Sequence, residues 1–167
     1  AAKKILSAYL NLLTVYADQP YDQKPILYPD SDVPIVEPEN IGGTDTLGDK
    51  EQKTLEIAKA AIQNGERVLI YTSWVRTDSQ QKLKKLLTDE GYRTEILTDK
   101  IKTTDREDWV QKKLAAGMQV LIVNPSLIET GLDLNAFTTL VFYSMGYKLF
   151  TLRQASRRSW RINQKAP

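Results

Sequence analysis

Four arginines stand close together near the end of the chain, in the stretch TLRQASRRSWRINQKAP. They lie within nine residues, and no acidic residue offsets them: Arg153, Arg157, Arg158 and Arg161. On a helix, Gln154, Arg158 and Arg161 fall at i, i+4 and i+7, so one face carries an amide and two guanidinium groups. A guanidinium group can donate two parallel hydrogen bonds to two phosphate oxygens. A row of such groups can neutralise charge on a transferring phosphoryl group. The alternative interpretation is a surface helix whose arginines serve only solubility.

The composition excludes several kinds of chemistry. The 167 residues include no cysteine and no histidine, which removes thiolate chemistry, the usual neutral-pH general base and the commonest zinc ligands. No glycine precedes a lysine, as a phosphate-binding loop requires, and no GxGxxG is present. We therefore expect neither a complete active site nor a metal site. No apolar run approaches the ~18 residues of a membrane span, and no secretory signal is visible, so we expect no membrane partner and a cytoplasmic location.

Charge is distributed unevenly along the chain. Residues 134–167 hold six basic residues and no acidic one, whereas the first 133 residues hold 17 basic and 21 acidic residues. The net charge of +2 therefore combines a basic end with a body of net charge −4. This asymmetry favours an anionic partner that binds in one place.

The elements that must position the arginines alternate between helices and strands. Residues 1–17 carry the apolar stripe of an amphipathic helix, and residues 18–48, rich in proline and aspartate, predict a long surface loop. Helices that begin near Asp49, Thr77 and Thr104 are expected to stop at Gly65, Gly91 and Gly117. The expected strands cover 67–71, 93–97, 119–123 and 139–143, and a last helix covers roughly 149–161.

This order of elements predicts both a fold and the place of its chemistry. The expected helix caps are Asp49 with Gln52, Thr77 with Gln80, and Thr104 with Glu107. Strands that alternate with capped helices predict βαβ units, and continuous apolar strands predict a parallel sheet covered on both faces, an α/β/α arrangement. In such sheets ligands bind at the carboxyl ends of the strands. We therefore expect function in the segments that follow Tyr71, Leu97, Val123 and Tyr143.

Several motifs, in order and spacing, resemble those of superfamily 2 helicases. QASRRSWRINQ (154–164) is similar to motif VI in the QAxGRxxRIGQ form of Swi/Snf-type ATPases, although Arg157 and Asn163 stand where that pattern has glycine. VLIVNPSLIETGLDL looks like motif V, in which Gly131 and Asp133 match, and RVLIYTSW is similar to motif IV. The resemblance implies a RecA-like helicase C-terminal lobe.

The resemblance extends over most of residues 1–164. TTDREDWVQKKLAAGMQVLIV resembles the segment between motifs IV and V, with Arg106 at the usual arginine, and LNLLTVYADQP looks like the helix that opens this lobe in Swi/Snf-type proteins. The link YSMGYKLFTLRQ looks closer to helicases of phages and bacterial mobile elements, so we suspect a bacterial or phage origin. We expect residues 1–48 to pack on or lead into the lobe, and 49–167 to form it.

The family resemblance also implies a nucleotide partner. In that family, ATP with Mg²⁺ sits between two RecA-like lobes, and the first lobe carries the Walker lysine and the DExx carboxylates. This chain has neither, so ATP and Mg²⁺ would be bound mainly by an N-terminal ATPase lobe of the same parent protein. The resemblance implies Arg161 as the arginine finger, Arg158 as a second phosphate contact and Gln154 as part of the interlobe arrangement. It implies that Gly131 and Asp133 touch the nucleotide sugar.

Nucleic acid is the second implied partner, with DNA favoured over RNA. Thr72, Ser73, Asn124 and Ser126, at the strand ends, would contact its backbone. Pro125 replaces a threonine that is frequent in Swi/Snf-type motif V, which removes an N–H and a hydroxyl from that contact.

Three functions remain open at this point. The first is the C-terminal lobe of an ATP-dependent DNA or RNA helicase or translocase, inactive as an ATPase by itself. The second is a non-catalytic helicase-like docking module, and the third is an unrelated doubly wound enzyme such as a transferase for phosphorylated sugars. An upstream Walker A and DExx sequence in the same reading frame separates the first two. The third requires Arg158 and Arg161 to face a closed pocket rather than an open cleft.

Overall fold

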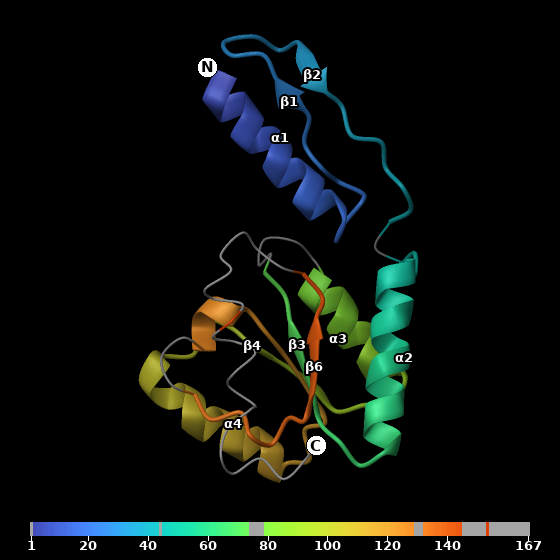
Figure 1. The fold of residues 1–167 in the computed structure, drawn as a ribbon, viewed down its shortest axis with the longest axis vertical. Coiled ribbons are helices and arrows are strands. Elements are labelled where there is room, and N and C mark those ends of the chain that lie inside the picture. The colour runs from blue at the N-terminus through green and yellow to red at the C-terminus, as the bar shows by residue number, and fades with distance from the viewer. Residues whose placement is uncertain (1, 44, 74–78, 129–131, 145–152, 154–167) are drawn as a thin grey trace.

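The computed structural model describes residues 2–43, 45–73, 79–128, 132–144 and Arg153 (Figure 1). Two parts of different build are visible within these residues. An N-terminal unit, residues 2–48, lies over one end of a larger lobe that begins at Asp49. Among the described residues, no helix combines the length and the apolar character that crossing a membrane requires.

The N-terminal unit consists of one helix and a small antiparallel ladder. The helix carries the expected apolar stripe but buries none of its residues. Within the surface loop predicted over 18–48, two short strands pair, which the sequence analysis did not predict. Asp30 adopts a φ of 58° in the intervening turn, and the Tyr28 N–H donates to the Val33 carbonyl at 2.9 Å. The elements are α1 (Ala2–Tyr16), β1 (Ile26–Leu27) and β2 (Pro34–Val36).

The lobe is built on a parallel sheet of four strands, as the sequence predicts. The strands pair in the order β4-β5-β3-β6, so β3 and β5 are central. All four residues of each central strand are buried, which explains their uninterrupted apolar sequence. The strands are β3 (Val68–Tyr71), β4 (Thr94–Leu97), β5 (Val120–Val123) and β6 (Thr139–Phe142).

Helices cover both faces of the sheet, which confirms the α/β/α arrangement. On one face, Ala58 of α2 and Leu83 of α3 pack with alternate strand residues such as Ile70. On the other face, Val110 of α4 packs with Leu121 and its neighbours. The helical elements are α2 (Asp49–Gln63), α3 (Ser79–Asp89), η1 (Thr103–Asp105), α4 (Arg106–Ala115) and η2 (Pro125–Ile128).

The helix stops were predicted correctly. Gly65, Gly91 and Gly117 follow the three lobe helices with φ values of 79°, 87° and 87°. A positive φ is strained for any residue with a Cβ, so glycine at these positions lets the chain leave the helix and enter the next strand.

The predicted helix caps were wrong where the structure describes them. Gly48 is the N-cap of α2 and makes no side-chain hydrogen bond, so Asp49 and Gln52 do not form a cap. Gln80 donates instead to the Thr72 hydroxyl at 2.6 Å, while Thr77 lies outside the described residues. The predicted pair for α4 is also engaged elsewhere: Thr104 donates to Asp105, and Glu107 accepts from the Asp133 N–H. For Gln80 and Glu107, residues from other segments have taken the place of the helix ends as partners.

Candidate functional site

Three strand ends bring polar side chains together at the carboxyl edge of the sheet. Ser73 follows β3, Asn124 and Ser126 follow β5, and Ser144 follows β6. We call these four residues the strand-end cluster. Because β3 lies between β5 and β6, their carboxyl ends are neighbours, and residues far apart in the sequence meet there.

Hydrogen bonds connect the whole strand-end cluster. The Ser73 N–H donates to Ser144 Oγ at 2.7 Å, and Ser73 Oγ donates to the Ser144 carbonyl at 3.0 Å. Asn124 Nδ2 donates to the Ser73 carbonyl at 3.0 Å. Asn124 Oδ1 accepts from both the N–H and the hydroxyl of Ser126, at 2.9 and 2.7 Å. Each strand end therefore fixes the next.

The members of the cluster differ in exposure. Asn124 and Ser144 are 8% and 6% exposed, whereas Ser73 is half-buried and Ser126 is exposed. Hydroxyl groups both donate and accept, so the two accessible serines offer neutral contacts to phosphate or sugar oxygens. Pro125, the first residue of η2, lacks an N–H, but the Ser126 N–H is satisfied by Asn124 and the turn is kept.

Thr72 adjoins the strand-end cluster without presenting a surface. It is fully buried, its N–H donates to the Val123 carbonyl at 3.0 Å, and its hydroxyl accepts from Gln80 of α3. In this arrangement Thr72 holds α3 against the sheet, and the cluster members Ser73 and Ser126 carry the accessible surface.

Arg106 anchors the segment that carries Ser126. Its guanidinium donates to the Leu127 carbonyl at 2.7 Å and to the Ile101 carbonyl at 3.2 Å, and the residue is 9% exposed. Arg106 therefore joins η2 to the loop before α4. The family resemblance singled out this arginine, but sequence reasoning assigned it no role, because its two acceptors are backbone groups that leave no trace in the sequence.

The predicted nucleotide-binding residues lie largely outside the described residues. This holds for Arg158, Arg161, Gln154 and Gly131. Asp133 is described and exposed: its N–H donates to Glu107 at 2.9 Å, and its carboxylate accepts from the Asn135 N–H at 3.0 Å. Asp133 thus shapes the loop between η2 and β6, and the described hydrogen bonds do not join it to the strand-end cluster.

A second polar group, which sequence reasoning missed, lies where the N-terminal unit meets the lobe. Asp18 forms an ion pair with Lys50 of α2, and Glu51 pairs with Lys82 of α3 at 3.2 Å. The Tyr143 hydroxyl donates to Glu51 at 3.1 Å. We call these five residues the junction cluster. Local sequence carried no signal for it, since its members come from four separate segments.

Burial changes the ionisation of the junction cluster. Desolvation raises the pKa of the Asp18 carboxyl, although Lys50 and Ser144 oppose that rise. Desolvation also raises the pKa of the Tyr143 hydroxyl, and the neighbouring Glu51 carboxylate adds to the effect. Tyr143 is therefore a neutral hydrogen-bond donor in this cluster.

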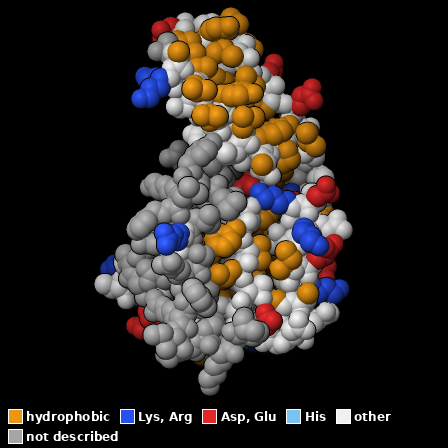
Figure 2. Space-filling model, in the orientation of Figure 1, with side chains coloured by type: hydrophobic (Ala, Val, Ile, Leu, Met, Phe, Trp, Pro, Cys, Tyr) orange, Lys and Arg blue, Asp and Glu red, His pale blue; other side chains and the backbone are white. Residues whose placement is uncertain are grey.

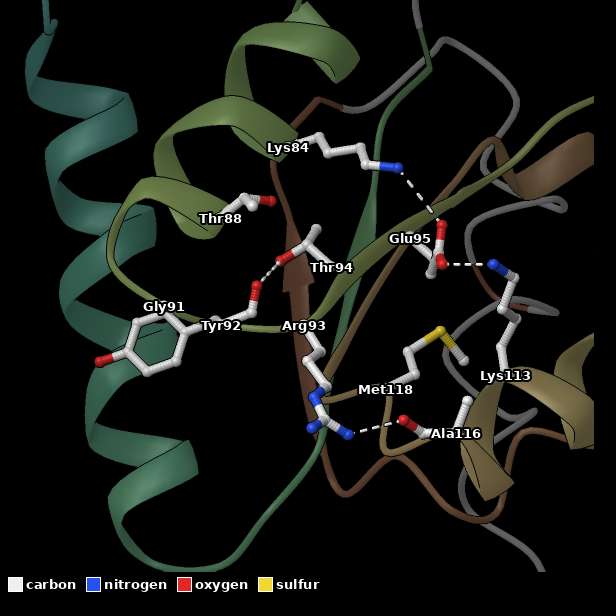
Figure 3. A pocket seen from close by; sticks show the side chains of 10 residues that line it. All are labelled: Lys84, Thr88, Gly91, Tyr92, Arg93, Thr94, Glu95, Lys113, Ala116 and Met118. Carbon is white, nitrogen blue, oxygen red and sulfur yellow. Dashed lines mark hydrogen bonds and ion pairs between the residues drawn. The ribbon is translucent and has the colours of Figure 1, made fainter.

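A hollow of about 340 Å³ lies along the edge strand β4, away from the strand-end cluster (Figure 3). Glu95 points into it between Lys84 of α3, at 3.3 Å, and Lys113 of α4. Burial raises the pKa of Glu95, but the two lysines outweigh it and leave the pKa below its ordinary value. The opposite charges compensate each other, and none of the predicted site residues lines this hollow.

The comparisons with known proteins agree with this architecture. Residues 49–163 match the family described as "Helicase conserved C-terminal domain". The C-terminal part of the Fun30 ATPase domain is similar with a TM-score of 0.62 and 18% identity, covering 72% of this chain and 41% of that chain. T4 UvsW is similar with a TM-score of 0.52 and 16% identity, covering 67% and 22%. No curated protein matches the chain.

The family match spans more than half of the chain, so the chain belongs to the helicase conserved C-terminal domain family. Its parallel sheet flanked by helices is the RecA-like fold of helicase C-terminal lobes. The match begins at Asp49, where α2 begins. At their low identities the two solved structures bear on the fold alone, and this chain spans less than half of either.

Proposed function

We propose that the chain is the C-terminal lobe of an ATP-dependent superfamily 2 helicase or translocase, and that its strand-end cluster contacts a nucleic-acid backbone. The observation that carries the proposal is the family match over residues 49–163, whose lobe holds Ser73, Asn124 and Ser126 in one hydrogen-bonded row at the carboxyl edge. Neutral hydroxyl and amide groups at a strand edge suit sequence-tolerant contacts to phosphate and sugar.

In this proposal the basic end of the chain supplies the nucleotide chemistry. Arg161 neutralises charge on the γ-phosphate, Arg158 makes a second phosphate contact, and Gln154 supports the interlobe arrangement. Gly131 and Asp133 lie beside the nucleotide sugar. No group of three or more His, Cys, Asp or Glu side chains that could hold a metal ion occurs among the described residues. We assign Mg²⁺ and most of the ATP contacts to an N-terminal ATPase lobe.

Nucleic-acid binding is tested by adding the same charge at two serines. Ser126→Glu puts a carboxylate in the strand-end cluster, and we expect it to weaken binding of a single-stranded oligonucleotide about tenfold at low salt. Ser31→Glu, in the β1–β2 turn, changes the net charge equally and is expected to shift affinity less than about twofold, because salt screens distant charges. Wild-type affinity should fall steeply with salt, and the assay should include duplex DNA and RNA of the same length.

The result separates the proposal from its alternatives. Equal effects of Ser126→Glu and Ser31→Glu would mean that only the net charge matters and that the strand-end cluster does not contact the nucleic-acid backbone. Binding that ignores salt would contradict a backbone-directed interface.

The nucleotide role is tested in the intact parent protein. There, Arg161→Ala should lower the ATP turnover rate by roughly 10³-fold or more while ATP binding changes far less. Arg161→Lys should rescue it only in part, because an ammonium lacks the planar fork. Arg153→Ala is the control, since Arg153 lies off the helical face of Gln154, Arg158 and Arg161. Equal losses for Arg153→Ala and Arg161→Ala would identify a general basic patch instead of a finger.

The isolated chain is expected to hydrolyse no ATP, since it has no Walker lysine. Magnesium-dependent turnover by this chain, abolished by Arg161→Ala, would overturn the assignment of the missing groups to another lobe.

A further inference from the structure

The N-terminal unit meets the lobe beside the carboxyl edge of the sheet (Figure 1). The segment that follows α1 places Asp18 and Tyr21 against the first turn of α2 and against Lys82 of α3. A hollow of about 280 Å³ lies at this contact, lined by Asp18, Tyr21, Lys50, Glu51 and Lys82 among others. The junction cluster therefore lies at the same end of the sheet as the strand-end cluster.

Lys50 connects the N-terminal unit to the end of β6. Its ammonium pairs with the Asp18 carboxylate, whose side chain is only 2% exposed. The same ammonium lies 4.5 Å from the centre of the Tyr143 ring, which is a favourable cation–π arrangement. Among the described residues, Asp18 Oδ2 makes no hydrogen bond, and the ion pair of Asp18 with Lys50 offsets part of the cost of burying this charge.

Tyr143 carries the connection into the strand-end cluster. Its hydroxyl is held by Glu51 and its N–H by the Tyr71 carbonyl, at 3.1 and 3.0 Å. The next residue, Ser144, exchanges two hydrogen bonds with Ser73. The placement of the Tyr143 ring therefore sets the backbone of Ser144, and Ser144 in turn sets the end of β3.

We propose that Asp18 and Lys50 are positioning residues for the strand-end cluster: their ion pair holds Tyr143, and thereby the Ser144–Ser73 contact, in the geometry that receives a nucleic-acid backbone. The binding part of this proposal rests on the proposed function, whereas the structural part does not. By thermodynamic linkage, docking of the N-terminal unit and binding of nucleic acid at the strand ends strengthen each other.

Two variants of opposite charge separate positioning from plain electrostatics. Asp18→Asn keeps the shape of the side chain and removes one negative charge. The net charge of the protein becomes more positive by one unit, which by itself favours binding of a polyanion. Lys50→Met keeps the unbranched stem over the Tyr143 ring and removes one positive charge. If the pair acts by positioning, both variants weaken oligonucleotide binding, by about three- to tenfold. If it acts only through space, the two variants shift the affinity in opposite directions.

The matched controls are Asp89→Asn and Lys85→Met. They remove the exposed ion pair on α3, whose side chains lie 3.0 Å apart, with the same two charge changes. Exposed pairs contribute little, so we expect both controls to leave affinity within about twofold. All titrations use the full 167-residue chain with a fluorescent single-stranded oligonucleotide.

Hydrogen exchange of single amides tests the structural part without any ligand. The Ser73 N–H is protected by Ser144 Oγ, and the Ile70 N–H lies in the buried middle of β3. In Asp18→Asn and Lys50→Met we expect Ser73 to exchange about fivefold faster or more, relative to Ile70. General destabilisation of the lobe would accelerate both amides instead, so the ratio distinguishes positioning from loss of stability.

The binding titrations test the binding part of the proposal, and the exchange ratio tests its structural part. Faster exchange at Ser73 with weaker binding in both variants supports the proposal, provided that the α3 controls change neither. Tighter binding by Asp18→Asn, or a Ser73-to-Ile70 ratio that stays as in wild type, overturns it. If wild-type protein binds no oligonucleotide, the proposed function fails, and the exchange ratio alone then decides whether Asp18 and Lys50 position the strand ends.

Discussion

The N-terminal unit and the lobe use their apolar residues in different ways. In the lobe, Leu69 and Leu121 are fully buried between the sheet and its helices. In α1 of the N-terminal unit, Leu6 and Leu13 remain 58% and 51% exposed, and Figure 2 shows hydrophobic side chains gathered over this unit. The lobe therefore draws its stability from a closed core, whereas the contacts between the unit and the lobe include the ion pair of Asp18 with Lys50 and the buried Tyr21 ring beside Lys82.

The largest expected difference between the two regions is the cost of truncating a leucine. Leu121→Ala empties a site in the middle of the sheet, and we expect it to lower the free energy of unfolding by about 2–5 kcal/mol. Leu13→Ala removes an exposed side chain of α1 and is expected to change it by no more than about 0.5 kcal/mol. Urea unfolding followed by circular dichroism measures both. Similar losses would mean that α1 contributes to the core as the lobe helices do.

The next effect concerns polar anchoring inside the lobe. Arg106→Ala removes the donor to two backbone carbonyls beside η2, and we expect a loss of about 2–3 kcal/mol in the free energy of unfolding. Arg106→Lys should recover only part of it, because one ammonium cannot reproduce the guanidinium fork. Lys112→Ala, at an exposed position of α4, is the control and should stay within about 0.5 kcal/mol. A full rescue by lysine would show that charge alone matters here.

The smallest effect is a pair of opposite pH dependences. The pKa of Asp18 is raised above its ordinary value of 3.8, so the folded state holds this proton more tightly than the unfolded chain. The stability that this protonated carboxyl contributes is fully present below about pH 3.8 and is lost as the pH rises through the raised pKa of Asp18. The pKa of Glu95 is lowered from 4.5, so its contribution is present above 4.5 and is lost as the pH falls through the lowered pKa.

Unfolding free energies measured between about pH 3 and pH 7 test this contrast. Asp18→Asn should remove a decline of stability with rising pH, and Glu95→Gln should remove an increase. If both variants changed the pH dependence in the same direction, the buried junction and the edge of β4 would not differ in the way described.

The sequence predicted the described elements of the lobe well because local patterns specify them, whereas the predicted last helix over 149–161 lies outside the described residues except for Arg153. The apolar runs around Ile70 and Ile122 became the central strands, and Gly65 and Gly117 ended their helices as expected. Parallel strands place their carboxyl ends at one edge, so the meeting of Ser73 with Asn124 also followed from the pattern. The roles of Arg158 and Arg161 in nucleotide binding stay predictions.

Tertiary structure alone decided how individual polar side chains are used. Gln80 and Glu107 have the spacing of helix caps, yet Gln80 bonds Thr72 and Glu107 bonds the Asp133 N–H. A cap contributes only about 1 kcal/mol, so a polar partner that the fold brings close can replace it. The short β1–β2 ladder was missed for a related reason, since a ladder of two and three residues has no periodicity to detect.

What the sequence determined by itself is therefore the described helices and strands of the lobe, the parallel arrangement of those strands and the edge at which their polar ends meet. These follow from apolar periodicity and from glycine, which act over a few residues. What only the tertiary structure decided is the junction cluster, in which Tyr143 bonds Glu51 across 92 residues of sequence and Lys50 lies between Asp18 and the Tyr143 ring. Ion pairs and ring contacts between distant segments depend on the packing of the whole chain, and no local pattern encodes them.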